Sequence, residues 1–241
     1  MCGRITQRRS PDEYVRDIGW TCAQEHAVCS AAPRYNTAPG MSVLLLHRLH
    51  DGICHVDRMN WGYRPHWATS KKMPPAINAR IEKAVTGRFF APLWHTGRVI
   101  VPADGWYEWT GKPGAKQAWY IRLESDGPMY LAAIAGFRPD RKPDRGDGFA
   151  IVTESADAGM VDVHDRRPVV FSAENALLWM DAGLNAQRAE QLAQSRSRPT
   201  QDFIWYPVST RVNRSGNDGP DLIKPVKLPS GPGSDISSSL F

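Results

Sequence analysis

The sequence predicts a single α+β domain built on a curved, mostly antiparallel sheet or partial barrel with helices around it. Two observations favour this class. Short runs of aliphatic, β-branched and aromatic residues recur along the chain, bounded by Gly, Pro, Asn or Asp, which is typical of strands. Helical patterns occur at intervals and do not alternate with these runs as repeated βαβ units would. With 241 residues, 41% of them hydrophobic, the chain can form one sizeable domain.

The first predicted element is a helix over residues 11–18. Ser10 can cap its amino end, a proline follows in the first turn, and Glu13 completes a capping box. The side chains expected on its inner face are Tyr14, Val15 and Ile18. The stretch that follows, as far as Pro33, is expected to be a loop or weakly helical.

Most later elements are predicted to be strands. The predicted strands are residues 43–46, 55–61, 98–101, 106–109, 118–123, 129–137, 149–153 and 205–208. Asp126-Gly127 predicts a hairpin turn between two of them. Helices are expected over 172–180 and, capped by Asn185, to about 194. Residues 228–241 are rich in Ser, Gly and Pro and are expected to be a disordered tail, which leaves 2–227 as the domain.

Composition and charge exclude several classes of protein. Lysine and arginine outnumber aspartate and glutamate by 30 to 25, and this net charge of +5 is a weak indication of a polyanionic partner. The sequence contains no apolar run of about 18 residues and no secretory signal, so we expect a cytoplasmic protein. Its cysteines are then expected to be reduced, and their spacing does not fit a zinc site. The cysteines are Cys2, Cys22, Cys29 and Cys54.

The second residue of the chain is a cysteine. If Met1 is removed, Cys2 carries an α-amine and a thiol two carbons apart. Their ordinary pKa values, ~7.7–8.0 and ~8.5, leave both groups partly nucleophilic near neutral pH. An amine attacks an aldehyde to give an imine, which the thiol can close into a thiazolidine ring, and the same pair suits N-terminal-nucleophile hydrolysis. On position alone, such a cysteine is more often an incidental residue of an unstructured terminus.

Five further clusters combine polar functional groups with Gly, Pro or aromatic residues at strand ends or in loops, where sites are often found. The clusters are residues 34–40, 61–63, 78–82, 103–109 and 163–168. Each one taken singly is better explained by turn formation and surface ion pairs. Their order along the chain, together with Cys2-Gly3-Arg4, is more specific.

The combination resembles the SOS response-associated peptidase (SRAP) family, whose members shield abasic sites in single-stranded DNA. The matching motifs are Cys-Gly-Arg at 2–4, Arg-Tyr-Asn-x-Ala-Pro-Gly at 34–40, Asn-Ala-Arg-x-Glu at 78–82, Asp-Gly-Trp-x-Glu-Trp at 104–109 and His-Asp-Arg-x-Pro at 164–168. They cover roughly residues 2–225. The resemblance therefore implies the SRAP fold for nearly the whole chain.

The resemblance also implies roles for four residues. Cys2 is the nucleophile, and Glu108 orients and deprotonates its amine. Glu108 lies between two tryptophans, and partial desolvation there would raise its pKa. His164 can donate a proton to the sugar ring oxygen, because imidazole titrates near neutral pH. Asn78 positions the Cys2 end by neutral hydrogen bonds, and Asp165 is expected to pair with a neighbouring arginine, Arg166 or Arg167.

A second set of residues is expected to contact DNA. The set consists of Arg4, Asn36, Pro39, Trp67, Arg80, Arg88, Thr153 and Arg166. Arginine grips phosphates bidentately, and an aromatic ring stacks a base at a gain of ~1–3 kcal/mol. The chain departs from the family pattern at two places: Arg167 stands where Met is usual, and the loop 64–72 is longer, with Trp67 in place of a pair of aromatics.

These expectations add up to one hypothesis. The protein binds single-stranded DNA with little sequence preference, captures an abasic site through Cys2 as a covalent thiazolidine, and removes its own Met1; the resemblance also implies possible lyase-type activity. No metal or organic cofactor and no membrane partner are expected; the protein is predicted to be monomeric and to meet the replication machinery. Two alternatives remain open. Cys2 could serve a true peptidase or amidohydrolase, or Trp67 and Trp109 could hold a flipped, modified base without covalent capture.

Overall fold

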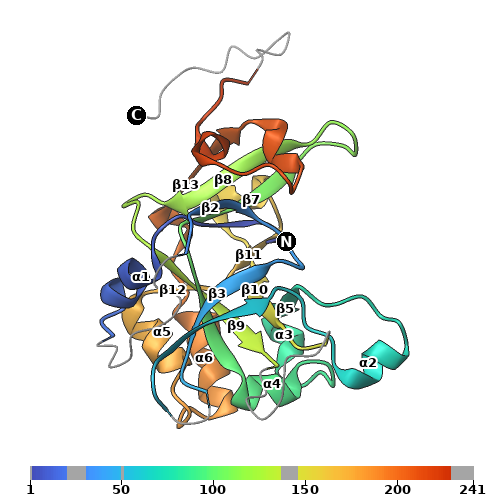
Figure 1. Ribbon diagram of the computed structural model, residues 1–241, viewed down its shortest axis with the longest axis vertical. Coiled ribbons are helices and arrows are strands. Elements are labelled where there is room, and N and C mark those ends of the chain that lie inside the picture. Colours follow the sequence, from blue (N-terminus) through green and yellow to red (C-terminus); the bar gives the residue numbers. More distant parts are fainter. Residues whose placement is uncertain (1, 21–30, 50–51, 137–145, 229–241) are drawn as a thin grey trace.

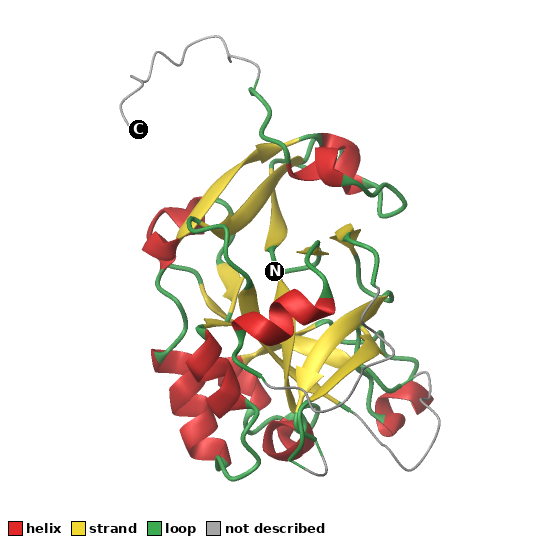
Figure 2. Cartoon of the chain, turned by 60° about the vertical axis from the view of Figure 1, so that its left-hand side comes forward, coloured by secondary structure: helices red, strands yellow, loops and turns green. Residues whose placement is uncertain are grey.

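The computed structural model describes residues 2–20, 31–49, 52–136 and 146–228. In this part of the chain the strands form two sheets, and Figure 1 shows the smaller one above the larger, with helices gathered at the lower end. Figure 2, turned by 60°, shows the same separation of the two sheets. The α+β class predicted from the sequence is therefore confirmed, and the strands divide between two sheets where one was expected.

The smaller sheet is antiparallel in every pairing that the structure describes. Its order is β13 (Phe203–Val208), β8 (Gln117–Leu123), β7 (Gly105–Thr110), β1 (Ile5–Gln7) and β2 (Arg34–Thr37). Strand β1 lies between β7 and β2, where Ile5 pairs with Trp106 on one side and Thr37 on the other. The amino end of the chain is thus fixed along the strand that carries Glu108.

The larger sheet contributes the middle layer of the molecule. Its main order is β11 (Arg166–Pro168), β10 (Phe149–Ser155), β9 (Met129–Ala135), β6 (Arg98–Ala103), β3 (Ser42–His47) and β4 (His55–Asn60). In addition, β12 (Val170–Phe171) pairs with β9, and β5 (Asn78–Arg80) pairs in parallel with β10. Strand β5 carries Asn78 at one edge of this sheet.

Five of the described helices pack on the face of the larger sheet that is turned away from the smaller one (Figure 1). They are α1 (Pro11–Asp17), α3 (Ile81–Ala84), α4 (Ala91–Thr96), α5 (Ala173–Trp179) and α6 (Ala186–Ser195). Helix α2 (His66–Ser70) lies to one side of this layer (Figure 1). Short 3₁₀ turns lie at η1 (Ala158–Asp162), η2 (Thr200–Asp202), η3 (Thr210–Asn213) and η4 (Pro220–Ile223). Among the described residues, no helix combines the length and the hydropathy needed to cross a membrane.

Alternate residues of β9 show that both faces of the larger sheet are buried. Tyr130 and Ala132 pack with the helices, whereas Leu131 and Ala133 pack in a second core between the two sheets. This second core also contains Cys2, which is fully buried. The amino-terminal cysteine is therefore part of the packed interface between the sheets and not an unstructured end.

Helix α1 confirms the local signals read from the sequence. The Ser10 hydroxyl accepts a hydrogen bond from the Glu13 N–H, and the Glu13 carboxylate accepts one from the Ser10 N–H, which completes the capping box. The predicted inner face is buried. Predicted positions within residues 21–30 and the predicted disorder of the tail from 229 onward lie outside the described residues.

The hairpin predicted at Asp126-Gly127 is wrong. Strand β8, before this turn, pairs with β7 and β13, whereas β9, after it, pairs with β6, β10 and β12. Asp126 does adopt the positive φ (56°) that a tight turn requires. The tight turn is therefore present, but it connects a strand of one sheet to a strand of the other. Local backbone geometry does not decide which strand a segment pairs with.

Candidate active site and nucleic-acid interface

The fold holds Cys2 in place through two hydrogen bonds, one to the Cys2 carbonyl and one to the backbone two residues further on. The Asn78 side-chain amide donates to the Cys2 carbonyl oxygen at 2.9 Å. Two residues further on, the Arg4 carbonyl accepts from the Tyr107 N–H of β7 at 2.9 Å. Because β5 is itself hydrogen-bonded to β10, Asn78 connects the buried cysteine to the larger sheet. The side-chain oxygen of Asn78 is buried and has no hydrogen-bond partner among the described residues.

Glu108 lies on β7 with only 3% of its surface exposed. Burial disfavours the charged carboxylate and raises its pKa to about 7. The sequence expectation of partial desolvation is confirmed in its direction. At neutral pH this carboxyl group is divided between its protonated and ionised forms, which suits a group that must both accept and return a proton.

The Cys2 thiol behaves differently from what the sequence suggested. Burial raises its pKa well above the ordinary range, and the negative charge of Glu108 raises it further. The expectation that this thiol is partly ionised near neutral pH is therefore wrong for the folded chain. The site stabilises a neutral thiol beside a carboxyl group of intermediate acidity.

His164 lies in the loop between η1 and β11, and its imidazole is partly exposed. Its Nδ1 accepts a hydrogen bond from the Arg166 backbone N–H at 3.0 Å and lies 2.7 Å from Asp165 Oδ1. Burial lowers the pKa of this histidine. The ring is therefore mostly neutral at physiological pH, and its Nδ1 is held by the Arg166 N–H.

The ion pairs expected for Asp165 are not formed. Arg166 makes a two-pronged pair with Glu82 of α3 (2.7 and 3.1 Å), and Arg167 pairs with Glu154 at 3.0 Å. Asp165 is left beside His164 instead. The reason is strand alternation: neighbouring side chains of β11 point to opposite faces, so each arginine meets a different carboxylate.

Three residues predicted to contact DNA are buried. Arg166 is 7% exposed and also donates to the Thr153 carbonyl at 2.7 Å, and Thr153 itself is fully buried. Asn36 is buried too, and its amide donates to the carbonyls of Val212, Arg214 and Asn217. In this structure these side chains hold the walls of the site together.

Arg4 occupies an intermediate position. One of its guanidinium nitrogens donates to Asn36 Oδ1 at 2.5 Å and to the Val212 carbonyl at 2.9 Å. The guanidinium carbon lies 5.6 Å from the centre of the Trp109 ring, which in turn donates to Asn213 at 2.7 Å. Residues 210–217, which contact Arg4, Asn36 and Trp109, were not predicted to lie here, because η3 is about a hundred residues from β7 along the chain.

The other predicted contacts lie on the surface. Arg80, Arg88 and Pro39 are exposed. Trp67 on α2 is half-buried, with the Arg88 guanidinium 4.8 Å and the Lys71 ammonium 5.9 Å from its ring centre. An indole flanked by cations presents the two features that single-stranded nucleic acid needs, a stacking surface and positive charge.

Asp104 was not singled out as a site residue, although it anchors the strand that leads from Cys2. It is 1% exposed and accepts hydrogen bonds from the backbone N–H of Arg8 (2.6 Å) and from the Tyr14 hydroxyl (2.6 Å). Arg9 forms an ion pair with the same carboxylate. Its position before Gly105 in the Asp-Gly-Trp motif was the available signal, but only the tertiary structure shows the partners.

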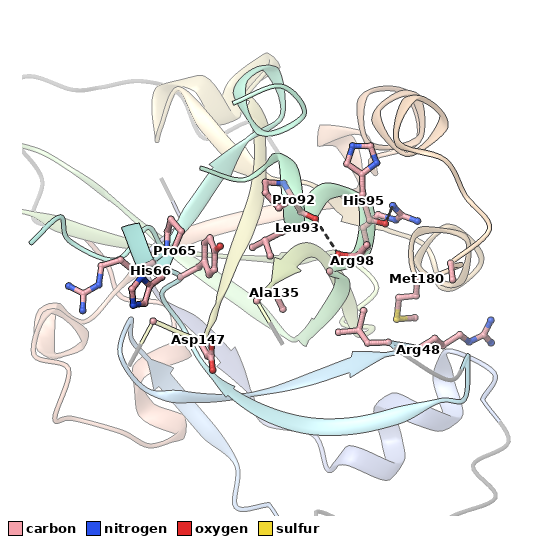
Figure 3. Close-up of a pocket in the computed structure, with 18 of the residues that line it drawn as sticks. Arg48, Pro65, His66, Pro92, Leu93, His95, Arg98, Ala135, Asp147 and Met180 are labelled. Atoms are coloured by element: carbon pink, nitrogen blue, oxygen red, sulfur yellow. Dashed lines mark hydrogen bonds between the residues drawn. The ribbon is translucent and has the colours of Figure 1, made fainter. Parts of the chain in front are cut away.

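A cavity of about 680 Å³ lies elsewhere in the molecule. Figure 3 shows Leu93, Ala135 and Met180 on its apolar wall, with His66 and Asp147 at one end. None of the four predicted catalytic residues is among the described residues that line it. The Cys2 cluster is therefore separate from this cavity.

The fold and the site together define a class of protein: a two-sheet α+β domain with a buried cysteine at position 2, supported by an asparagine and a buried glutamate. A family model described as SOS response associated peptidase (SRAP) matches residues 1–215. The chain belongs to the SRAP family.

Similar proteins carry a consistent name. The chain is 42% identical over 234 residues to abasic site processing protein YedK of Escherichia coli (strain K12), which covers 94% of this chain and 100% of the relative. It is 31% identical to abasic site processing protein YoqW of Bacillus subtilis (strain 168), over 93% of this chain and 99% of the relative. It is 28% identical to abasic site processing protein HMCES of Pongo abelii, over 93% of this chain and 69% of the relative.

Solved structures share the fold. A phage-related protein from Bordetella bronchiseptica superimposes with a TM-score of 0.73 at 40% identity, covering 86% of this chain and 94% of that one. A protein from Bacteroides thetaiotaomicron gives a TM-score of 0.75 at 19% identity, covering 94% of this chain and 100% of the other. At this low identity the second match supports the fold alone.

Proposed function

We propose that this protein processes abasic sites in single-stranded DNA by capturing the lesion covalently on Cys2. The single observation that carries the proposal is the Cys2 cluster: a buried cysteine held by Asn78 beside Glu108, whose pKa of about 7 suits proton transfer. The names of the relatives, all abasic site processing proteins, support the same substrate. The same residues support the capture chemistry that we propose.

Capture begins once Met1 has been removed, because only then does Cys2 have a free amine. The closed sugar of an abasic site opens when its ring oxygen receives a proton, which His164 supplies, and its anomeric hydroxyl releases one to water. The Cys2 amine then attacks the exposed aldehyde carbon, and Glu108 carries the two amine protons in turn to the former aldehyde oxygen. Water leaves and an imine forms.

The thiol acts last. It adds to the imine carbon, a C–S bond forms, and the thiol proton passes to the imine nitrogen, so the product is a neutral thiazolidine. The raised pKa of the thiol supports this order, since a protonated thiol competes poorly with the amine for the aldehyde. No oxidant, reductant or metal enters the balance.

DNA binding is proposed to rest on charge and stacking. Arg80 and Arg88 are exposed beside the site and beside Trp67, and these groups contact backbone and base faces without reading sequence. Arg4, Asn36, Pro39, Thr153 and Arg166 stay proposed as parts of the same interface. For the buried members of this set, we infer that they shape its walls. The same proposal includes autoproteolytic release of Met1 and lyase-type activity. It also includes a monomeric protein that meets the replication machinery in the cytoplasm.

The decisive experiment mixes the purified protein with single-stranded DNA containing one abasic site and separates the products on a denaturing gel. A heat-stable shifted band is expected, and Cys2→Ala is expected to abolish it. An intact-mass measurement of the same sample reports whether Met1 is present. If Cys2→Ala crosslinks as well as the wild type, the mechanism is wrong; turnover of added peptides would instead favour the hydrolase alternative.

A further inference from the structure

Asp165 has no part in the capture steps described above, although it lies directly beside the proposed acid. Its Oδ1 is 2.7 Å from His164 Nδ1, while 79% of its side chain is exposed. The arginines that follow it both pair with other carboxylates. A negative charge at the edge of a surface meant for DNA opposes phosphate binding, so its contact with His164 calls for a separate explanation.

The geometry points to Asp165 as a positioning residue that, together with the Arg166 backbone N–H, supports the His164 ring in both of its protonation states. The inference rests on the proposed function, because it concerns the acid of that reaction. It adds a residue to which that reaction has assigned no role.

The two partners of Nδ1 serve different forms of the ring. When the imidazole is neutral with its proton on Nε2, Nδ1 accepts from the Arg166 N–H at 3.0 Å. When the imidazole is charged, Nδ1–H donates to Asp165 Oδ1. Of the two forms, the charged ring is the proton donor in the proposed reaction, and in that form Asp165 faces the Nδ1–H.

Both partners are themselves held by the fold. The Asp165 carbonyl accepts from the Ala156 N–H at 2.9 Å, which fixes the backbone from which its side chain extends. The Arg166 side chain is locked by its two bonds to Glu82. The support for His164 is thus built by β10, β11 and α3 together.

The charges around the ring act in known directions. Burial lowers the pKa of His164, as does the positive charge of Arg166, whereas Asp165 raises it. The pKa of Glu108 is raised chiefly by burial and in addition by Asp165. One carboxylate therefore raises the pKa of both the proposed acid and the proposed base.

This shared influence gives a distinctive pH signature. Crosslinking needs Glu108 ionised and His164 protonated, so its rate falls at low pH as Glu108 gains a proton and at high pH as His164 loses one. Asp165→Asn removes the charge and lowers both pKa values. The variant should therefore crosslink faster than the wild type on the acidic limb and slower on the basic limb, whereas simple damage to the site slows both limbs.

The test measures single-turnover crosslinking of labelled abasic DNA by the full chain, at saturating protein, from about pH 5 to 9. The Asp165→Asn variant is expected to crosslink roughly two- to fivefold more slowly at the basic end and correspondingly faster at the acidic end. A change of this size corresponds to the free energy of an exposed ion pair. Asp165→Glu should keep the wild-type profile. Asp162→Asn, a change at an exposed acid in the neighbouring η1 turn, is the matched control and should also leave it unchanged. An unmoved profile in Asp165→Asn, or a uniform loss across pH, overturns the inference.

A second measurement separates this inference from the proposed function. The His164 imidazole is titrated by NMR in the DNA-free protein, with the signal assigned from a His164→Asn variant. Asp165→Asn should lower the pKa of His164, and an unchanged value contradicts the role of Asp165. If the wild type fails to crosslink, the proposed function is lost, but this titration still tests the support of the ring.

Discussion

Replacing Glu108 with glutamine removes a buried charge that lowers the free energy of unfolding. The pKa of this carboxyl rises from its ordinary value of 4.5 to about 7 because its side chain is 3% exposed. At 1.36 kcal/mol per pKa unit, this corresponds to about 3 kcal/mol of stability lost when the group is ionised in the folded state. Glutamine has nearly the same shape and carries no charge, so it avoids this loss.

The sign of the effect follows from proton linkage. A carboxyl with a raised folded pKa costs nothing below about pH 4.5, where it is protonated in both the folded and the unfolded chain. The cost grows between about pH 4.5 and 7 and is complete above that window. Glu108→Gln should therefore match the wild type in stability near pH 4.5 and exceed it by about 3 kcal/mol near pH 8.

The assay is urea unfolding of both proteins at several pH values, followed by tryptophan fluorescence. The informative quantity is the difference in unfolding free energy between variant and wild type as a function of pH. A difference that stays constant from about pH 4.5 to 8 refutes the reasoning, because it means that Glu108 titrates normally in the folded chain. The same variant should crosslink abasic DNA slowly, so stability gained at this position is expected to be activity lost.

Three further predictions follow from single contacts. Asn78→Ala removes one partly buried hydrogen bond to the Cys2 carbonyl, worth ~0.5–1.5 kcal/mol, and should slow crosslinking about two- to tenfold with DNA binding retained; an unchanged rate would show that the bond does not position Cys2. Gly105→Ala places a Cβ 2.3 Å from the Tyr120 ring and should lower stability by ~1–3 kcal/mol in a thermal melt, unlike Gly216→Ala, where the space is open. Arg80→Ala should weaken noncovalent DNA binding and reduce the slope of its salt dependence by about one phosphate contact, and an unaltered slope would remove Arg80 from the interface.

The elements that the sequence predicted well are those specified by neighbouring residues. Helix α1 begins at a capping box whose two members are three residues apart, and α6 begins at the cap Asn185, which accepts from the Arg188 N–H. The long apolar strands β3, β6 and β9 were found because their composition alone marks them as buried. The short strands β1, β2, β5 and β11 were missed, since three or four residues give too little periodicity.

The candidate site shows the same division. Motif order indicated Cys2, Asn78, Glu108 and His164, and the contact between Asn78 and Cys2 was among the expectations. The partners of Asp165 and Arg166 were assigned wrongly or not at all, because they depend on which face of β11 each side chain occupies and on α3 lying against it. Ion pairs between distant segments leave no local trace in a sequence.

The sequence by itself determined the family, the helix starts, the buried strands and the residues that we propose to react, all of which depend on composition and short spacings. Only the tertiary structure decided that the strands divide into two sheets, that Cys2 is packed between them, and that burial makes its thiol neutral while moving the pKa of Glu108 to about 7. The physical reason is that desolvation depends on every segment that covers a group. Those segments come together only when the chain is folded.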